Sequence, residues 1–257
     1  MTGGEKADRL FTEPVLAELY DRWAPAPQRG DFGFYLPLVM SAGSVLDVGC
    51  GTGELLRLAR QAGHAGRLCG LDPAPAMLAL ARRRPDIEWV LGDAASAAWW
   101  QEFDLVVMTG HAFQVLVSDE EISAALAAVR AALAPGGRFA FETRNPAARA
   151  WEDWTPGNAV QVTGPTGAVV TMTHEVTAPF DGATVTFTTT YTSPDWAGPE
   201  LSRSTLRFLS PAGLASFLAG AGLAIHEQFG DWDRAPLART SPEIITIAGL
   251  AGQAVGS

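Results

Sequence analysis

The segment from Val45 to Leu56, VLDVGCGTGELL, constrains the fold of this 257-residue chain more than any other. Apolar residues that favour a buried strand come first, and the residues after the last glycine can begin a helix. Glycines at positions 49, 51 and 53 let the chain turn sharply out of the strand and leave room for a ligand against the backbone. The segment therefore predicts a strand–loop–helix unit with a small-molecule site at the carboxyl end of the strand.

The same strand and helix pattern repeats up to about Thr143, which predicts a parallel sheet with right-handed crossovers. The expected strands are residues 45–48, 68–72, 88–93, 103–108 and 138–143. Ser118 and Glu121 form a capping box, so a helix is expected to begin there and to end at Pro135.

The pattern changes after Asn145. Between about residues 160 and 209, apolar and hydroxyl-bearing residues alternate, which is typical of an antiparallel sheet. Ser210 and Pro211 then mark the start of a helix, and two more strands are expected near residues 224–229 and 243–248.

We therefore expect an α/β, Rossmann-like sheet with an inserted antiparallel β subdomain. Residues 1–40 form an N-terminal helical lid, with an amphipathic helix at Pro14–Trp23, and residues 41–145 form the α/β core. Residues 146–209 form the β insertion, and residues 210–257 complete the core.

Composition argues against several classes of partner. The formal net charge is −10 and no run of basic residues is longer than Arg82–Arg84, so we expect no nucleic-acid partner. The first ten residues lack the apolar segment of a signal peptide, and no stretch is long enough to cross a membrane, so we expect a cytoplasmic protein. No histidine lies near Cys50 or Cys69 at metal-ligand spacing, so we expect two small buried side chains and no metal site.

Three aspartates lie at the carboxyl ends of the first three expected strands. The carboxyl ends of parallel strands meet at one edge of a sheet, so Asp47, Asp72 and Asp93 should face one crevice. Each could instead cap a helix. Glu54 occupies the position where a dinucleotide-binding loop has its third glycine, and its charge would repel a pyrophosphate. This disfavours a nicotinamide dinucleotide and favours a nucleoside ligand that has no phosphate.

Four segments, "VLDVGCGTG", "GLDPAPAMLALARRR", "VLGDAA" and "FDLVVM…LAPGGRFAFE", resemble successive motifs of class I S-adenosylmethionine-dependent methyltransferases. The resemblance covers residues 44–143 and, more loosely, the two closing strands. It implies a seven-stranded sheet whose last strand is antiparallel, and an N-terminal helix that closes over the cofactor.

The resemblance also assigns the methionine end of the cofactor. It implies that Gly49, Gly51 and Gly53 lie alongside the methionine part of the cofactor. It also implies that Asp47 binds the amino group of that part directly or through water. Tyr20 is the candidate contact from the lid, although a plain role in the core is an alternative.

At the nucleoside end, the resemblance implies that Asp72 accepts from the ribose hydroxyls and that Pro73 and Met77 pack near the adenine. Asp93 accepts from the adenine amine, and the backbone N–H of Ala94 faces the ring.

The acceptor side is less constrained. His111 follows the fourth strand and is the one histidine we nominate as a catalytic base, with a titration near neutral pH; the alternative is a structural loop histidine. Tyr35, Arg144 and Trp151 are candidate walls for an aromatic or anionic acceptor, or else ordinary packing residues.

We expect a methyltransferase that acts on a small-molecule acceptor by in-line methyl transfer. The Asn/Asp-Pro-Pro-aromatic motif of adenine N-methylation is absent, and position 109–111 reads Thr-Gly-His, which favours such an acceptor. The β insertion then builds the substrate chamber or a contact in a homodimer. The alternative is a non-catalytic protein that binds the cofactor or a nucleoside as a sensor or accessory subunit.

Overall fold

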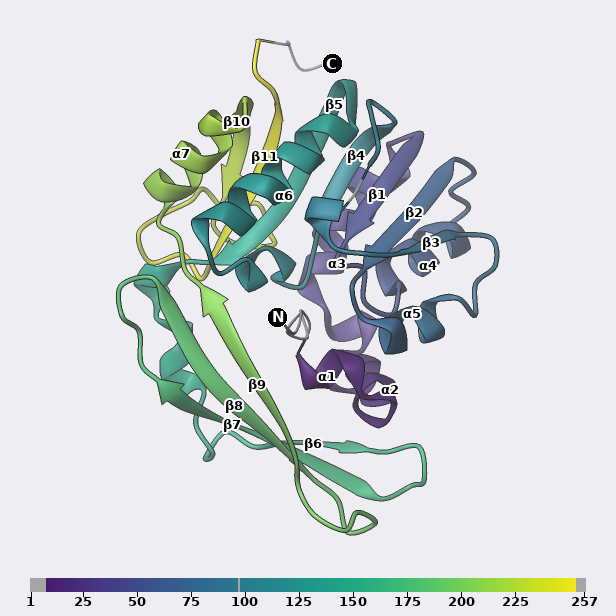
Figure 1. Ribbon diagram of the computed structural model, residues 1–257, viewed down its shortest axis with the longest axis vertical. Helices are drawn as coiled ribbons and strands as arrows, with labels where there is room; N and C mark the ends of the chain where they lie inside the picture. Colours follow the sequence, from purple (N-terminus) through teal and green to yellow (C-terminus); the bar gives the residue numbers. More distant parts are fainter. Residues whose placement is uncertain (1–7, 97, 253–257) are drawn as a thin grey trace, which may run out of the picture.

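The computed structural model describes residues 8–96 and 98–252, which form a seven-stranded sheet flanked by helices and a separate four-stranded antiparallel sheet (Figure 1). The large sheet contains β1 (Ser44–Val48), β2 (Arg67–Asp72), β3 (Glu88–Leu91), β4 (Phe103–Met108), β5 (Leu133–Arg144), β10 (Leu223–Phe229) and β11 (Glu243–Leu250). The helices are α1 (Arg9–Thr12), α2 (Pro14–Trp23), α3 (Gly30–Met40), α4 (Glu54–Gln61), α5 (Pro75–Ala81), α6 (Asp119–Ala132) and α7 (Pro211–Gly220). Short 3₁₀ turns are η1 (Ala26–Gln28), η2 (Ala94–Ser96), η3 (Ala112–Val115), η4 (Pro146–Ala148) and η5 (Ala150–Asp153).

The strand order in the large sheet is β10-β11-β5-β4-β1-β2-β3. Strands β1 to β5 pair in parallel, whereas β11 is antiparallel to both β5 and β10. This confirms the expected α/β, Rossmann-like sheet and its antiparallel last strand. The glycine-rich loop follows β1, near the middle of the sheet, where the winding of the chain reverses direction. Ligands of open α/β sheets bind at such a point.

Helices cover both faces of this sheet. The side chains of α6 and α7 pack with Leu46 and Val48 on one face, and those of α3 and α4 pack with Val45 on the other. The capping box of α6 is present as predicted, with Glu121 N–H donating to the Ser118 hydroxyl. Alternation along β1 thus separates the two layers.

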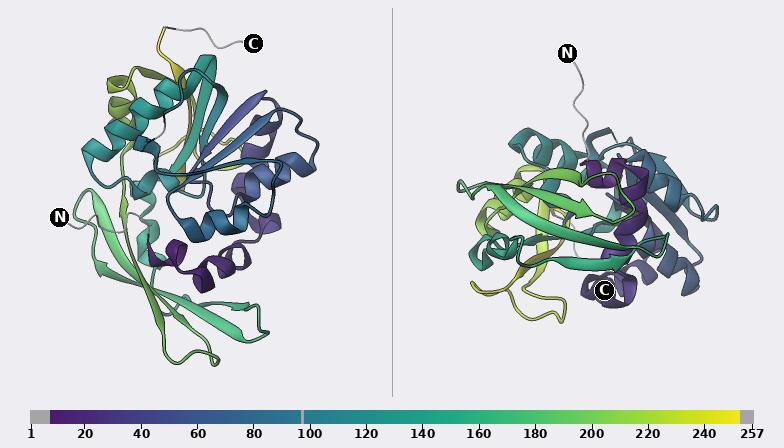
Figure 2. Two further views of the ribbon diagram at one scale, coloured as in Figure 1. Left: turned by 45° about the vertical axis from the view of Figure 1, so that its right-hand side comes forward. Right: turned by 90° about the horizontal axis from the view of Figure 1, so that it is seen from below.

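The N-terminal segment divides into two parts. The sequence pattern predicts one lid over residues 1–40, but α3 packs against the sheet, where its aromatic residues Phe32, Phe34 and Tyr35 are buried. Only α1 and α2 lie beyond the carboxyl edge of the sheet, between it and the inserted strands (Figures 1 and 2).

The inserted sheet contains β6 (Val160–Thr163), β7 (Val169–Ala178), β8 (Thr184–Thr192) and β9 (Glu200–Arg207), paired in sequence order. It confirms the predicted antiparallel insertion. Leu16 and Leu19 of α2 pack against Val170 and Tyr191 of this sheet. The Ser202 hydroxyl on β9 accepts from the backbone N–H of Leu10, 3.0 Å away. The insertion and the N-terminal helices therefore form one covering layer over the carboxyl edge.

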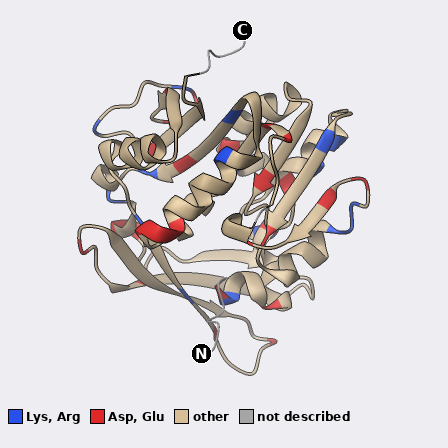
Figure 3. Ribbon diagram, turned by 45° about the horizontal axis from the view of Figure 1, so that its top comes forward, with Lys and Arg blue, Asp and Glu red and all other residues tan. Residues whose placement is uncertain are grey.

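The structure also bears on membrane crossing, on the two cysteines and on the distribution of charge. No helix within residues 8–96 and 98–252 combines the length and hydropathy that a bilayer crossing needs. Cys50 and Cys69 are free and buried. Acidic and basic residues are interspersed along the ribbon (Figure 3).

Candidate active site

The glycine-rich loop after β1 gives different roles to its glycines. Gly51 has φ +55, and a Cβ atom added there would meet nothing within 4 Å, so this residue faces open space. Gly53 has φ +76, and its added Cβ would lie 2.2 Å from the Trp89 ring. Gly51 therefore leaves room for a ligand, whereas Gly53 is required by the packing of Trp89 beneath the loop.

Three adjoining cavities open around this loop. The central one has a volume of about 570 Å³ and is lined by Gly49, Gly51 and Asp72 with side chains from α1, α2 and β9. A second, of about 130 Å³, shares Gly49 and Pro73 with it and extends past Asp93. A third, of about 30 Å³, reaches down to Asp47. The central cavity thus shares lining residues with each of the two smaller ones.

Asp47 lies at the bottom of the smallest cavity. It is 1% exposed, and its Oδ1 atom has no hydrogen-bond partner among the described residues. Burial raises the pKa of Asp47 to about 7, and the nearby Arg29 guanidinium opposes this shift. Buried carboxylates are normally paired, so the free oxygen indicates a donor supplied by a ligand.

Asp72 organises the loop from the end of β2. Its two carboxylate oxygens accept from the backbone N–H groups of Gly51 and Ala74, both at 2.8 Å. Each oxygen keeps a second lone pair, and Asp72 lines the central cavity. Asp72 thus supports the loop in addition to facing the site.

The other nucleoside-end residues lie around the second cavity. Asp93 and Ala94 line it, and Asp93 Oδ1 also accepts from the backbone N–H of Ser96, as a helix cap would. Pro73 lines both larger cavities, and the fully buried Met77 lines the central one. The structure therefore brings these candidates together, while their contacts with a cofactor stay predictions.

Tyr20 places the N-terminal helix over the site. It lines the central cavity and the smallest one, and its ring lies edge-on to Phe11 at a centroid distance of 5.8 Å. Helix α2 is joined to the glycine loop by a 2.8 Å hydrogen bond from the Thr52 hydroxyl to Asp21. Tyr20 thus faces two of the cavities, and its contact with a cofactor stays a prediction.

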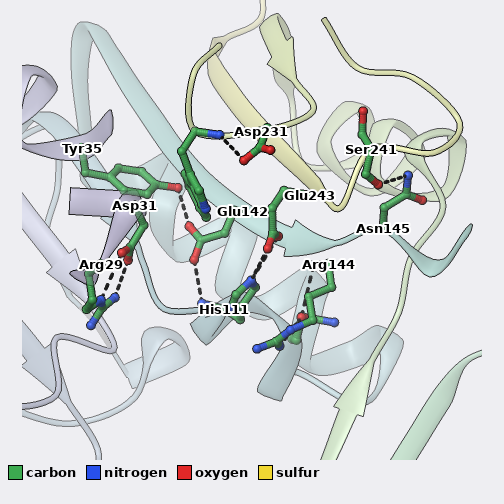
Figure 4. Close-up of polar contacts among 12 residues, drawn as sticks. Arg29, Asp31, Tyr35, His111, Glu142, Arg144, Asn145, Asp231, Ser241 and Glu243 are labelled. Carbon is green, nitrogen blue, oxygen red and sulfur yellow. Dashed lines mark hydrogen bonds and ion pairs between the residues drawn. The ribbon is translucent and has the colours of Figure 1, made fainter. Parts of the chain in front are cut away.

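His111 is held in a constrained position at the carboxyl edge of β4. Its backbone is left-handed, with φ +62 and ψ +24, which is uncommon for a residue other than glycine. Its backbone N–H donates to Glu142 at 2.7 Å, and its Nε2 lies 3.0 Å from both carboxylate oxygens of Glu243 (Figure 4). Burial and the nearby Arg144 lower the pKa of His111 to about 3.

The predicted titration of His111 near neutral pH is therefore wrong. Burial and the Arg144 cation both disfavour the charged imidazolium, so the pKa of His111 is lowered. Burial instead raises the pKa of Glu243 to about 7, so the carboxyl group of this pair is the one that titrates near neutrality.

Tyr35 lies below this site and lines none of the cavities described above. It is fully buried on α3, and its hydroxyl donates to Glu142 (Figure 4). Next to it, the Arg29 Nε donates to Asp31 at 3.1 Å. Tyr35 thus supports Glu142 from beneath, and its role as a substrate wall stays a prediction.

Residues 45–137 match the family described as "Methyltransferase domain". These residues form a methyltransferase domain. The chain is 41% identical over 103 residues to the 2-phytyl-1,4-naphtoquinone methyltransferase of Thermosynechococcus vestitus, a match that covers 38% of this chain and 44% of the relative. The chain thus spans somewhat less than half the length of that curated relative.

The methyltransferase domain and the insertion together resemble solved structures. The CcbJ methyltransferase of Streptomyces caelestis matches with a TM-score of 0.75 and 23% identity over 94% of this chain and 99% of that one. CalS10, described as an amino pentose methyltransferase of Micromonospora echinaspora with bound SAM, matches with a TM-score of 0.64 and 27% identity over 87% and 94% of the two chains. The fold is that of S-adenosylmethionine-dependent methyltransferases.

Two candidate residues follow the methyltransferase domain, at the start of the insertion. The Arg144 guanidinium donates to Gln114 Oε1 at 3.0 Å and lies 5.5 Å from the Trp154 ring centroid. Trp151 is 8% exposed and packs in an apolar cluster, with its ring 4.6 Å from that of Phe180. Neither Arg144 nor Trp151 lines any of the described cavities, and their role as acceptor walls stays a prediction.

Three further residues of the site did not emerge from the sequence. Arg29 lies on the linker before α3, Glu142 is inside β5, and Glu243 begins β11. For Glu142 and Glu243 the sequence did hold a signal, since both are charged residues within the expected strands 138–143 and 243–248. A charge in a buried strand is normally paired or functional. Their partners lie far away in the sequence, so only the fold shows them.

Proposed function

We propose that this protein is an enzyme that transfers a methyl group from S-adenosylmethionine to a small-molecule acceptor. The observation that carries the proposal is the buried carboxylate of Asp47, which has an unpaired oxygen at the bottom of a pocket beside the glycine loop. The amino group of the cofactor would supply the missing donor. Arg29 lines the same pocket and offers a cation for the carboxylate of the cofactor.

The remaining cavities fit the other parts of this cofactor. Asp72 offers free lone pairs for the ribose hydroxyls, and Pro73 and Met77 give an apolar wall for the adenine. Asp93 and the backbone of Ala94 lie at the far end, where the adenine amine would lie. Glu54 at the start of α4, directly after the glycine loop, opposes the pyrophosphate of a dinucleotide.

When bound, the cofactor supplies an electrophilic methyl group for in-line displacement by the acceptor. The chain contributes by holding the acceptor in line and excluding water, which can supply much of the catalysis. His111 lies at the carboxyl edge of β4, and a neutral imidazole can accept a proton from an acceptor hydroxyl, acidic carbon or ammonium. A neutral amine would need positioning alone.

The acceptor is proposed as a small molecule, and N-, O- and C-methylation all stay open. The relatives include a naphthoquinone and an amino pentose methyltransferase, which act on different kinds of acceptor. The net charge of −10 supports the absence of a nucleic-acid partner, and action in the cytoplasm belongs to the same proposal. The insertion is proposed to close the acceptor chamber; a homodimer contact is its other proposed role.

The test is methyl transfer from labelled S-adenosylmethionine to a panel of phenols, hydroquinones and primary amines. We expect turnover on at least one class. Gly51→Val should abolish it, because the added side chain fills the open space at the loop. Tight binding of the cofactor without turnover on any acceptor would favour the sensor or accessory role instead. Absence of cofactor binding would reject both.

A further inference from the structure

Glu243 is in an unusual electrostatic position. It lies directly opposite Arg144 in the antiparallel pairing of β11 with β5. Opposite charges in such cross-strand positions commonly pair. Here no ion pair joins the two residues, because Arg144 turns to Gln114 and Glu243 directs both carboxylate oxygens to His111 Nε2, at 3.0 Å each.

The other atoms of His111 are also fixed. Its backbone N–H donates to Glu142, and Glu142 in turn accepts from the Tyr35 hydroxyl. The left-handed backbone is thus held from two sides, as is typical of residues kept in a strained position for a function. The Nδ1 atom has no partner among the described residues. His111 itself lines none of the three cavities, whereas its sequence neighbours Gly110 and Ala112 line the central one.

We infer that Glu243 is a positioning residue that accepts a hydrogen bond from Nε2–H of His111 and leaves Nδ1 as the atom that takes the proton from the acceptor. The inference rests on the proposed function. In the step, the bond between the acceptor atom and its proton breaks and leaves its electron pair on that atom. The proton forms a new N–H bond at Nδ1, and the carboxylate of Glu243 stabilises the resulting imidazolium. The acceptor therefore carries a hydroxyl, an acidic C–H or an ammonium proton at the methylated atom.

The pair also predicts how the base responds to pH. When Glu243 is protonated, its O–H donates to Nε2, and the neutral imidazole carries its proton on Nδ1, where it cannot act as a base. When Glu243 is ionised, the proton moves to Nε2 and frees Nδ1. Groups that face the pair are Arg144 and Glu142 on β5, Asp31 and Arg29 at α3, and Asp231 after β10. Because the pKa of Glu243 is about 7, the active tautomer should form as the pH rises through 7.

The test measures the tautomer directly. Protein with ¹⁵N-labelled histidine would be studied by long-range ¹H–¹⁵N correlation spectra between pH 5.5 and 9, with His111→Gln assigning the signals. We expect an Nε2–H imidazole at pH 9 and an Nδ1–H imidazole at pH 5.5. Glu243→Gln should remove the transition, and Glu227→Gln, an exposed glutamate on the adjacent β10, should preserve it. An Nδ1–H signal at pH 9, or a transition that persists in Glu243→Gln, would overturn the inference.

A second measurement separates this inference from the proposed function. Glu243 lines none of the three cavities, so Glu243→Gln should bind S-adenosylhomocysteine within about twofold of the wild type. With an acceptor found in the panel, the kcat of Glu243→Gln should be at least about tenfold below that of the wild type. The pH profile of the variant's kcat should lack the inflection near pH 7. Failure of the wild type to bind S-adenosylhomocysteine would refute the proposed function. Normal binding with an unchanged pH profile in Glu243→Gln would refute the positioning role alone.

Discussion

At the scale of single residues, this site contains several buried carboxylates, and Asp47 Oδ1 among them has no hydrogen-bond partner in the described residues. Asp47 and Glu243 both have a pKa raised to about 7 by burial, and Glu142 is shifted upward for the same reason. In a fold without a ligand such groups are costly, since burial of a charge is normally compensated by pairing. Carboxyl groups with shifted pKa values that gather at one edge of a sheet are typical of a functional site.

Cofactor affinity should depend on pH through Asp47. In the ligand-free protein its carboxyl group is protonated below about pH 7, and the ammonium group of a bound cofactor favours the ionised form. Affinity for S-adenosylhomocysteine should therefore rise by up to about tenfold per pH unit below 7 and level off above it. Calorimetric titration between pH 6 and 8, in buffers with different ionisation enthalpies, should show release of a proton.

Two variants assign this effect. Asp47→Asn should bind more weakly and lose the dependence, whereas Glu243→Gln should retain it. A pH-independent affinity in the wild type would mean that Asp47 does not meet the cofactor's amino group.

Asp72 should affect both binding and stability. Asp72→Ala removes the expected ribose contact, which should weaken the binding of S-adenosylhomocysteine by roughly 1.5–3 kcal/mol. It also leaves the N–H groups of Gly51 and Ala74 without their acceptor, so the melting temperature of the ligand-free protein should fall. Asp153→Ala, at an exposed aspartate, is the control and should change neither the affinity nor the melting temperature. Unaltered affinity in Asp72→Ala would show that the nucleoside binds elsewhere.

At the scale of elements, the glycine loop and the covering helices create the space for the ligand. The loop turns out of β1 with three glycines at positive φ, and α2 is joined to it through Asp21 and Thr52. Helix α2 also packs on the inserted sheet through Leu16 and Leu19. The loop and its cover are thus one connected unit, which explains why a sequence segment before the domain contributes to the site.

Gly51→Val should weaken binding by at least about tenfold, equivalent to about 1.4 kcal/mol, because the branched side chain occupies the open space at the loop. Strain at positive φ would also lower stability, so a matched control is needed. Gly63→Val introduces the same side chain at φ +93, again with nothing within 4 Å, in the turn after α4. That variant should lose stability but retain affinity in calorimetric titration. Equal loss of affinity in both would show that the loop space is not the ligand site.

At the scale of the whole molecule, the site lies between two sheets that are separate in the sequence. The large sheet provides Asp47, Asp72 and His111 at its carboxyl edge, and the inserted sheet with α1 and α2 closes over them (Figure 2). Strand β9 contributes Arg203 and Thr205 to the central cavity. A ligand that fills this space should therefore stabilise both parts together.

S-adenosylhomocysteine should raise the melting temperature of the full chain. At 100 times the dissociation constant, binding to the folded state adds about 2.7 kcal/mol, which corresponds to a shift of roughly 5–10 °C for a protein of this size. NADH at the same concentration should give no shift, because Glu54 disfavours a pyrophosphate at the loop. Differential scanning calorimetry measures both. A larger shift with NADH would reject the proposed cofactor.

The sequence by itself determined the parallel sheet, the antiparallel insertion and the likeness to methyltransferases. These features depend on local patterns: the alternation of apolar strands and amphipathic helices, the three glycines after β1, and the capping box at Ser118. Asp47 and Asp72 could be placed at one edge because the carboxyl ends of parallel strands meet there. Such inferences need only short-range periodicity and the rules of chain connection.

Tertiary structure alone decided which charges meet. Glu243 lies 132 residues after His111 in the sequence, and Tyr35 lies 107 residues before Glu142, so no periodicity links them. Burial in the folded chain lowered the pKa of His111 and raised that of Glu243. A pKa depends on the solvent and charges around a group in space, and these are fixed only when distant segments pack together.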